Sequence, residues 1–224
     1  KEKSGAFSDA EIVLGELPES VMEELDLVVL SPGVPTDLPM VNAIRDKKIP
    51  IIGEIELAYQ CAKGKILAIT GTNGKTTTTA LLGEIMKNYF SDVKVVGNIG
   101  IPYTSVAADT TEETVTVAEI SSFQLETAVE FRPEVSAILN ITPDHLNRHH
   151  TMENYIAAKE SITKNQTADD ICVLNYEDEV LREFGAGLQT KVIYFSSARK
   201  LENGYYLDGT DICRAVDGKA EHIC

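Results

Sequence analysis

The sequence predicts an α/β protein: a mostly parallel sheet covered by helices, preceded by a partial Rossmann-like N-terminal domain. Short β-branched runs alternate with helical stretches along the chain, a pattern typical of parallel sheets flanked by helices. The 224 residues, 43% of them hydrophobic, are enough for one large domain or two modest ones. We place a boundary between residues 1–62 and residues 63–224, because Gly64 follows a predicted helix and glycine readily ends helices.

The part before this boundary contains two short apolar runs that predict buried strands. Residues 27–30 read Leu-Val-Val-Leu and stop at Ser-Pro-Gly, and residues 49–52 follow a polar helix predicted at 38–46. A further helix is predicted at 54–62. Two strands make an incomplete sheet, and the chain starts without methionine, so we expect a piece of a longer protein.

The larger part shows strands and helices in regular succession. Helices are predicted from residue 75 to about 89 and from 153 to 164. Strands are predicted at 66–70, 93–96, 114–120, 135–141, 171–174 and 192–195. After Leu201, Asp-Gly turns flanked by short apolar runs predict an antiparallel hairpin added to the sheet edge.

The composition argues against several classes of partner. Asp and Glu number 35 against 20 Lys and Arg, a formal net charge of −15 that repels nucleic-acid phosphates and anionic membranes. We therefore expect neither a nucleic-acid nor a membrane partner, and no apolar run approaches the roughly 20 residues that cross a bilayer. The 4 cysteines form no C-x-x-C pair and are too few for a disulfide framework, which fits a reducing cytoplasm.

The strongest local signal is a glycine loop between a predicted strand and a predicted helix. Glycines let the backbone fold around a phosphate, Lys75 adds a cation, and the Thr76 hydroxyl can bind Mg²⁺. The usual spacing, G-x-x-x-x-G-K-[ST], would place a glycine where the chain has Ile69, so the loop is a shortened one. A turn without a ligand is the less favoured alternative. The predicted nucleotide-binding residues are Gly71, Thr72, Asn73, Gly74, Lys75, Thr76 and Thr77.

Polar residues follow the next strands at the edge where α/β sheets bind ligands. Asn98 follows the second strand of the larger part, and Glu119 ends the third. A carboxylate there is costly to bury alone but favourable beside a divalent ion, so a metal role and a solvated strand end are about equal readings of Glu119.

Histidines and a lysine farther along the chain are weaker candidates. His145 stands beside Asp144 after the fourth strand, which favours a ligand role over simple packing. We interpret His149 and His150 as loop residues. Lys159 would ordinarily lie on a solvated helix face, and residue chemistry alone does not select it.

Three motifs occur together in this chain: the loop at 71–77, Asn-Ile-Thr-Pro-Asp-His-Leu-Asn-Arg-His at 140–149, and Tyr-Ile-Ala-Ala-Lys at 155–159. The combination resembles the Mur ligases, ATP-dependent amide-forming enzymes of peptidoglycan precursor synthesis. The segments at 119–126 and 31–35 resemble the D-glutamate-adding branch more than its sister branches or folylpolyglutamate synthase.

The resemblance implies a set of site residues. It implies catalytic roles for Lys75, Glu119, His145 and Lys159. Thr76 and Glu119 would bind one Mg²⁺ that bridges the ATP phosphates, and His145 would help bind a second. Lys159 would be carbamylated by CO₂ and become an anionic oxygen donor to the metal. Residues implied to contact the UDP-muramoyl substrate are Ser31, Pro32, Gly33, Asn98, Ser121 and Gln124.

The implied reaction joins D-glutamate to UDP-N-acetylmuramoyl-L-alanine. A substrate carboxylate would attack the γ-phosphate of ATP to give an acyl phosphate, and the amine of D-glutamate would displace the phosphate. Electrostatic stabilisation would carry the catalysis, and no protein nucleophile is expected. The enzyme would be a cytoplasmic monomer of cell-wall biogenesis, and therefore of cell shape and cell division.

The resemblance also has limits. Residues 1–62 would be an incomplete UDP-substrate-binding domain, and residues 63–224 an ATPase domain without its C-terminal end. Asn147 and His150 stand where the family more often has Asp and Gly. Because a carboxyl-terminal domain that contacts ATP and the amino acid has no counterpart, we expect little or no turnover from this chain alone. The alternatives are another Mur-type or folylpolyglutamate-type ligase, a phosphate-loop kinase or switch, and a nucleotide-binding module without catalysis.

Overall fold

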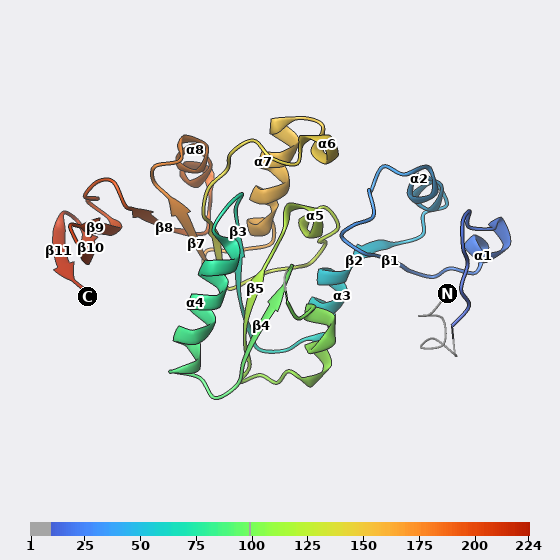
Figure 1. Cartoon of the computed structure of the whole chain (residues 1–224), viewed down its shortest axis with the longest axis horizontal. Coiled ribbons are helices and arrows are strands. Elements are labelled where there is room, and N and C mark those ends of the chain that lie inside the picture. The colour runs from blue at the N-terminus through green and yellow to red at the C-terminus, as the bar shows by residue number, and fades with distance from the viewer. Residues whose placement is uncertain (1–9, 99) are drawn as a thin grey trace.

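A computed structural model describes residues 10–98 and 100–224, which form two separate sheets (Figure 1). The helices are α1 (Glu19–Glu23), α2 (Pro39–Asp46), α3 (Glu54–Cys61), α4 (Lys75–Lys87), α5 (Ser122–Leu125), α6 (Leu146–His149), α7 (Met152–Glu160) and α8 (Glu179–Gly187), with short 3₁₀ turns η2 (Tyr103–Ser105), η3 (Ala107–Asp109) and η4 (Ser161–Thr163). The strands are β1 (Val28–Leu30), β2 (Ile51–Gly53), β3 (Lys65–Thr70), β4 (Val93–Gly97), β5 (Val115–Glu119), β6 (Val135–Ile138), β7 (Ile171–Asn175), β8 (Lys191–Ser196), β9 (Gly204–Asp208), β10 (Asp211–Val216) and β11 (Lys219–His222).

The smaller sheet consists of β1 and β2, paired in parallel with Val29 opposite Ile52. Helix α2 connects the two strands, as a parallel pair requires. The two strands predicted in this part are confirmed, and within the described residues they form a two-stranded sheet. The division of the chain at residue 62 stays a prediction.

The larger sheet has nine strands in the order β11-β10-β9-β8-β7-β6-β3-β5-β4. Neighbours from β4 to β9 pair in parallel, whereas β10 pairs antiparallel with both β9 and β11. The predicted mostly parallel α/β sheet with an antiparallel addition is therefore confirmed. The addition is larger than predicted, because two successive hairpins replace one.

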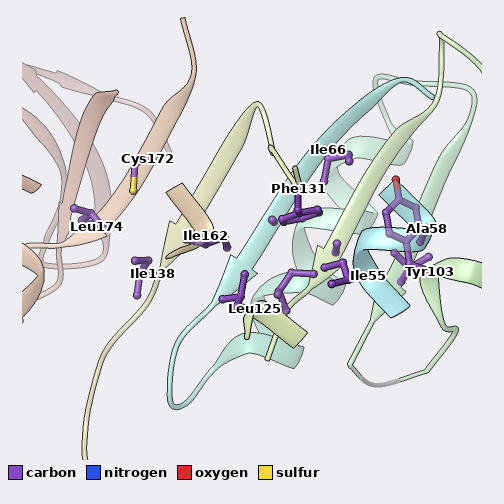
Figure 2. Packing of buried hydrophobic residues seen from close by; sticks show 14 of the residues in the cluster. Ile55, Ala58, Ile66, Tyr103, Leu125, Phe131, Ile138, Ile162, Cys172 and Leu174 are labelled. Atoms are coloured by element: carbon purple, nitrogen blue, oxygen red, sulfur yellow. The ribbon is translucent and has the colours of Figure 1, made fainter. Parts of the chain in front are cut away.

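Alternate residues of the central strands face opposite sides of the sheet. One set, including Ile66, Ile138 and Leu174, packs against side chains of α3, α5, α7 and α8 to form the main core (Figure 2). Ile55 from α3 and Leu181 from α8 are fully buried in this cluster.

The opposite face is covered less completely. Helix α4 packs against β3, β4 and β5. Beside it lies an apolar groove of about 490 Å³, lined by strand residues such as Leu67 and Val173 and by Leu81 and Ile85 of α4. The predicted covering of both faces of the sheet by helices is therefore confirmed, with α4 on this one.

The remaining differences concern element ends. Helix α7 stops at Glu160 and continues as the 3₁₀ turn η4, where a single helix to residue 164 was predicted.

Among the described residues, no helix combines the length and apolar character needed to traverse a lipid bilayer.

Candidate nucleotide-binding and catalytic site

The glycine loop connects β3 to the N-terminus of α4, as its sequence predicts. Gly71 has φ 145° and Gly74, the N-cap residue of α4, has φ 85°, values that other residues rarely adopt. A Cβ on Gly71 would also come within 3.1 Å of Leu139. The loop therefore needs both glycines, and its backbone N–H groups stand at the positive end of the α4 dipole.

The loop is fastened to the segment that follows β6. The Asn73 N–H donates to Asn140 Oδ1 at 2.9 Å, and Asn140 Nδ2 donates back to the Asn73 carbonyl at 3.1 Å. The Thr72 hydroxyl donates to the Thr142 carbonyl and accepts from the Thr142 N–H at 3.0 Å. It also lies 3.0 Å from the Tyr155 hydroxyl. The shape of the loop is thus fixed before any ligand binds.

Two lysines converge on one carbonyl of this loop. Lys75 Nζ donates to the Gly71 carbonyl at 2.9 Å and to the Thr72 carbonyl at 3.0 Å, and Lys159 Nζ donates to the Gly71 carbonyl at 2.8 Å. Because burial strips its amine of water and Lys75 adds a like charge, the pKa of Lys159 falls to about 7, although Asp144 opposes the shift. Its exposed fraction is 2%, so the expectation of a solvated face is wrong.

Glu119 ends β5 with a buried side chain, 2% exposed, so the solvated reading of this residue is wrong. Among the described residues, the side-chain hydrogen bond to its carboxylate comes from Asn98 Nδ2, at 3.1 Å from Oε1. The Asn98 N–H also donates to the Glu119 carbonyl at 2.9 Å. A buried carboxylate with this little support is suited to a cationic partner.

His145 lies at the solvent-facing rim, with 51% of its side chain exposed. Its backbone has φ 52°, and its backbone N–H donates a hydrogen bond to Asp144 Oδ1 at 2.8 Å. The preceding Thr142 is bonded to Thr72, so the histidine segment and the glycine loop are joined side by side. The predicted convergence of these two segments is therefore present.

The predicted substrate residues occupy two different settings. Ser31, Pro32 and Gly33 form a turn directly after β1, closed by the Val34 N–H donating to the Ser31 carbonyl at 2.9 Å. Ser121 and Gln124 instead form the capping box that starts α5, and Gln124 is buried. Their contact with a substrate stays a prediction.

Sequence reasoning missed three members of this region. His149 belongs to α6 and is 5% exposed, so its interpretation as a loop residue is wrong, whereas His150 caps the helix and is exposed. Arg148 and Glu126 form a largely buried ion pair. His149, Arg148 and Glu126 all lie within the motifs at 119–126 and 140–149, and this was the sequence signal that could have identified them.

The residues that the sequence implies as metal ligands do not form a complete metal-binding site by themselves. Within the described residues, no group of three or more His, Cys, Asp or Glu side chains is arranged to hold a metal ion. This is compatible with Mg²⁺, which is usually held by one or two protein carboxylates together with water and substrate phosphates.

Comparison with known proteins agrees with this architecture. The family model for the Mur ligase middle domain matches residues 69–220, which include the glycine loop, Glu119 and His145. The chain belongs to the Mur ligase family. A second model, the N-terminal domain of MurD-like Mur ligases, matches residues 3–53.

Relatives within the Mur ligase family are similar over nearly the whole chain. A UDP-N-acetylmuramoylalanine–D-glutamate ligase from Lachnoclostridium phytofermentans is 59% identical over 214 residues, 96% of this chain and 47% of the relative. One from Clostridioides difficile is 51% identical over 219 residues, 97% of this chain and 48% of the relative. The chain thus spans about half the length of the curated relatives it matches.

Solved Mur ligase structures share the fold. MurF from Thermotoga maritima in complex with ADP has a TM-score of 0.53 at 18% identity, covering 90% of this chain and 56% of that one. A UDP-N-acetylmuramate:L-alanyl-gamma-D-glutamyl-meso-diaminopimelate ligase from Neisseria meningitides has a TM-score of 0.58 at 17% identity, covering 87% of this chain and 66% of that one.

Proposed function

We propose that the chain is part of an ATP-dependent ligase that joins D-glutamate to UDP-N-acetylmuramoyl-L-alanine in peptidoglycan precursor synthesis. The observation that carries the proposal is the convergence of Lys75 and Lys159 on the Gly71 carbonyl, in a glycine loop that opens a helix. The choice of D-glutamate rests on the names of the relatives.

The nucleotide phosphates would bind at residues 71–77. The N–H groups at the start of α4 offer donors and a positive dipole end. Lys75 would exchange its hydrogen bonds to the Gly71 and Thr72 carbonyls for phosphate oxygens, a stronger pairing because both partners are charged. The hydrogen bonds between Asn73 and Asn140 and between Thr72 and Thr142 would hold the loop in shape during this exchange.

Thr76, Glu119, His145 and a carbamylated Lys159 would hold two Mg²⁺ ions together with phosphate oxygens. The ions would supply positive charge where a substrate carboxylate and the γ-phosphate must meet. The buried Glu119 carboxylate fits this role, since among the described residues it accepts a side-chain hydrogen bond from Asn98 and forms no ion pair.

Carbamylation of Lys159 would fit its surroundings. Its amine, with a pKa of about 7, is largely neutral at slightly alkaline pH. The nitrogen lone pair would form a bond to the carbon of CO₂, and an N–H proton would leave to water. The anion formed would replace the repulsion between Lys159 and Lys75 by attraction.

The chain's residues would orient the reactants without forming a covalent bond to them. Lys75 and the loop amides would stabilise charge on the transferred phosphoryl group, giving an acyl phosphate that the amine of D-glutamate attacks. Ser31, Pro32, Gly33, Asn98 and Ser121 would contact the UDP-linked substrate. Gln124 would act through Ser121, because its amide is engaged in the capping box.

Location and assembly are part of the same proposal. All 4 cysteines are free, as expected in a reducing cytoplasm. We expect a monomer whose binding partners are ATP, UDP-N-acetylmuramoyl-L-alanine and D-glutamate. Since the chain covers about half of its relatives, it alone should bind nucleotide with little or no turnover.

The test is phosphate release by a full-length protein that contains this chain. It receives ATP, Mg²⁺ and UDP-N-acetylmuramoyl-L-alanine with one amino acid at a time. D-Glutamate should stimulate release at least about tenfold over L-alanine, L-lysine or meso-diaminopimelate, a preference that a modest difference in transition-state binding supplies. Equal stimulation by the others would overturn the substrate assignment.

A further inference from the structure

A largely buried ion pair lies where the segment after β1 meets the larger sheet. Arg148 Nη2, on α6, is 2.7 Å from Glu126 Oε2, at the end of α5, and the two side chains are 12% and 15% exposed. The proposed function gives neither residue a task. A buried pair of this kind is costly to break, because the remaining partner keeps an uncompensated charge.

Both members of the pair also contact the loop at residues 31–37. Arg148 Nη2 donates to the Val34 carbonyl at 3.0 Å, and the Thr36 hydroxyl donates to Glu126 Oε2 at 3.3 Å. These contacts join residues 114 and 90 positions apart in the sequence. The pair therefore ties the loop that carries Ser31, Pro32 and Gly33 to the larger sheet.

The pair is braced on its other side by His149. Its Nδ1 lies 3.4 Å from Glu126 Oε1, and its Nε2 lies 2.9 Å from the Ser122 hydroxyl. Burial lowers the pKa of His149, which favours the neutral ring, and a neutral ring with its proton on Nδ1 would donate to Glu126 and accept from Ser122. Ser122, His149 and Glu126 are linked in the order of a hydrolase triad. Ser122 is only 3% exposed, however, so a substrate has no access to its hydroxyl.

The same pair reaches the His145 segment through an aromatic ring. The Arg148 guanidinium stands 4.9 Å from the centre of the Phe123 ring, and that ring is 5.0 Å from the His145 ring. The N–H of Arg148 donates to the His145 carbonyl at 2.9 Å. The side chain of Arg148 thus contacts the 31–37 loop and the Phe123 ring beside His145, whereas the bonds to the His145 carbonyl are made by backbone N–H groups and survive a change of that side chain.

We propose that Arg148 and Glu126 are positioning residues that set the distance between the 31–37 loop and the site formed by Lys75, Glu119 and His145. This role rests on the proposed function, in which the loop holds the UDP-linked substrate and the site holds ATP. Among the described residues, the hydrogen bonds and ion pairs of these two side chains do not reach the glycine loop. Loosening the pair should therefore misplace the sugar substrate and leave nucleotide binding unchanged.

The first test measures the loop itself and needs no substrate. Hydrogen exchange is followed in the full-length protein for wild type, R148M, R148K, E126Q and the control R199K, which alters the exposed Arg199–Glu177 pair. Amides at 31–38 should exchange about fivefold faster in R148M and E126Q, less so in R148K, and at the wild-type rate in R199K. Amides at 70–78 should not change. Unchanged exchange at 31–38 in both R148M and E126Q would overturn the proposal.

The second test measures kinetics in the same variants. The KM for the UDP-linked substrate should rise about tenfold in R148M, with partial recovery in R148K and a change of less than about twofold in the KM for ATP. An equal rise in both KM values, or a loss of kcat alone, would contradict a positioning role. If the variants show the expected exchange pattern but the activity of wild type does not depend on the UDP-linked substrate, the proposed function fails. The tie between the loop and the larger sheet then still stands.

Variants that fold poorly are identified before either test. The far-ultraviolet circular dichroism spectra of R148K and E126Q must match that of wild type. E126Q keeps the shape of its side chain and removes only the charge, so it remains informative if R148M unfolds. If every variant at both positions unfolds while R199K does not, the pair serves stability, and the positioning role is overturned.

Discussion

Lys159 shows how its surroundings change the chemistry of a single side chain. Its amine donates to the Gly71 carbonyl, lies 4.7 Å above the Tyr155 ring, and has a second lysine nearby. An ammonium group in such a place loses hydration without gaining an anionic hydrogen-bond partner, and the proton is therefore held weakly. A neutral amine inside a protein is a nucleophile toward CO₂.

The carbamate at Lys159 should form in a pH-dependent way. Below its pKa of about 7 the amine is protonated and unreactive, whereas above that pH it is neutral, so at fixed dissolved CO₂ the modified fraction should be larger at pH 8 than at pH 6. Carbon-13 nuclear magnetic resonance with labelled CO₂ measures it. The signal should disappear in K159R and persist in K191R, which changes an exposed lysine on β8. A signal of equal strength in K159R would contradict the assignment.

The sequence selected Lys159 only through the motif at 155–159, because residue chemistry did not distinguish it from a solvated lysine. Tyr155 and Lys159 are four positions apart, so they share one face of a helix, and both are buried. Glu119 was a stronger signal, because a charged side chain at the end of an apolar strand is costly to bury without a partner. Arg148 and Glu126 could not be paired from the sequence, since only the folded chain brings α5 and α6 together.

At the scale of elements, Glu56 joins α3 to the segment after α5. Its fully buried carboxylate accepts hydrogen bonds from the N–H groups of Val129, Glu130 and Phe131 at 2.8 to 3.0 Å. Gln60, one turn along α3, donates to the same carboxylate. Three backbone donors that no strand or helix satisfies are thus paired by one side chain.

The substitution E56Q should lower stability and spare the nucleotide site. An amide cannot accept three N–H groups as a carboxylate does, and a weakened set of charge-assisted bonds should cost about 1.5 to 3 kcal/mol of the free energy of unfolding. Urea unfolding measures this loss. E112Q, at an exposed residue, is the control. If fully folded E56Q bound Mg-ADP more weakly than wild type, the hydrogen bonds of Glu56 would influence the glycine loop, contrary to this account.

The substitution N140A should have the opposite signature. It removes the two hydrogen bonds that fasten Asn73, so the glycine loop should become mobile and Mg-ADP affinity should fall about tenfold, equivalent to roughly 1.4 kcal/mol. Isothermal titration calorimetry measures the affinity. N165A removes an amide that also donates to two backbone carbonyls, Val129 and Phe131, and should bind as wild type does. Equal affinities for N140A and wild type would show that the loop keeps its shape without Asn140.

Long elements were predictable from periodicity and short ones were not. The strands of the larger sheet and helix α4 follow from apolar runs and helical spacing. Helices α5 and α6 have 4 residues each, too few to show a period. Their starts depend on local contacts: a capping box at Ser121 and a left-handed backbone at His145.

At the scale of the whole molecule, the two faces of the large sheet differ. One is sealed by helices, while the other keeps the apolar groove beside α4, where Leu81 is 61% exposed. The sequence predicted strands and their general parallel arrangement, but not this asymmetry. It depends on the strand order, in which β3 lies between β6 and β5, and that order is decided by contacts far apart in the chain.

The groove should bind apolar probes. In this chain, L81Q removes apolar surface from the groove at an exposed position without adding charge, so the fluorescence of 8-anilinonaphthalene-1-sulfonate should fall to about half, with a stability change within about 0.5 kcal/mol. E84D, at an exposed residue of the same helix, keeps the net charge and is the control. Unchanged dye fluorescence in L81Q would place the apolar surface elsewhere.

The central claim is that the glycine loop with Lys75 is a nucleotide-phosphate site. The most direct measurement is isothermal titration calorimetry of Mg-ADP into this chain, comparing wild type, K75M and the control K191M. The account predicts measurable binding by wild type and K191M, and at least about tenfold weaker binding by K75M, since a charged phosphate contact is lost. Equal affinity in K75M and wild type, with all three proteins folded, would contradict it.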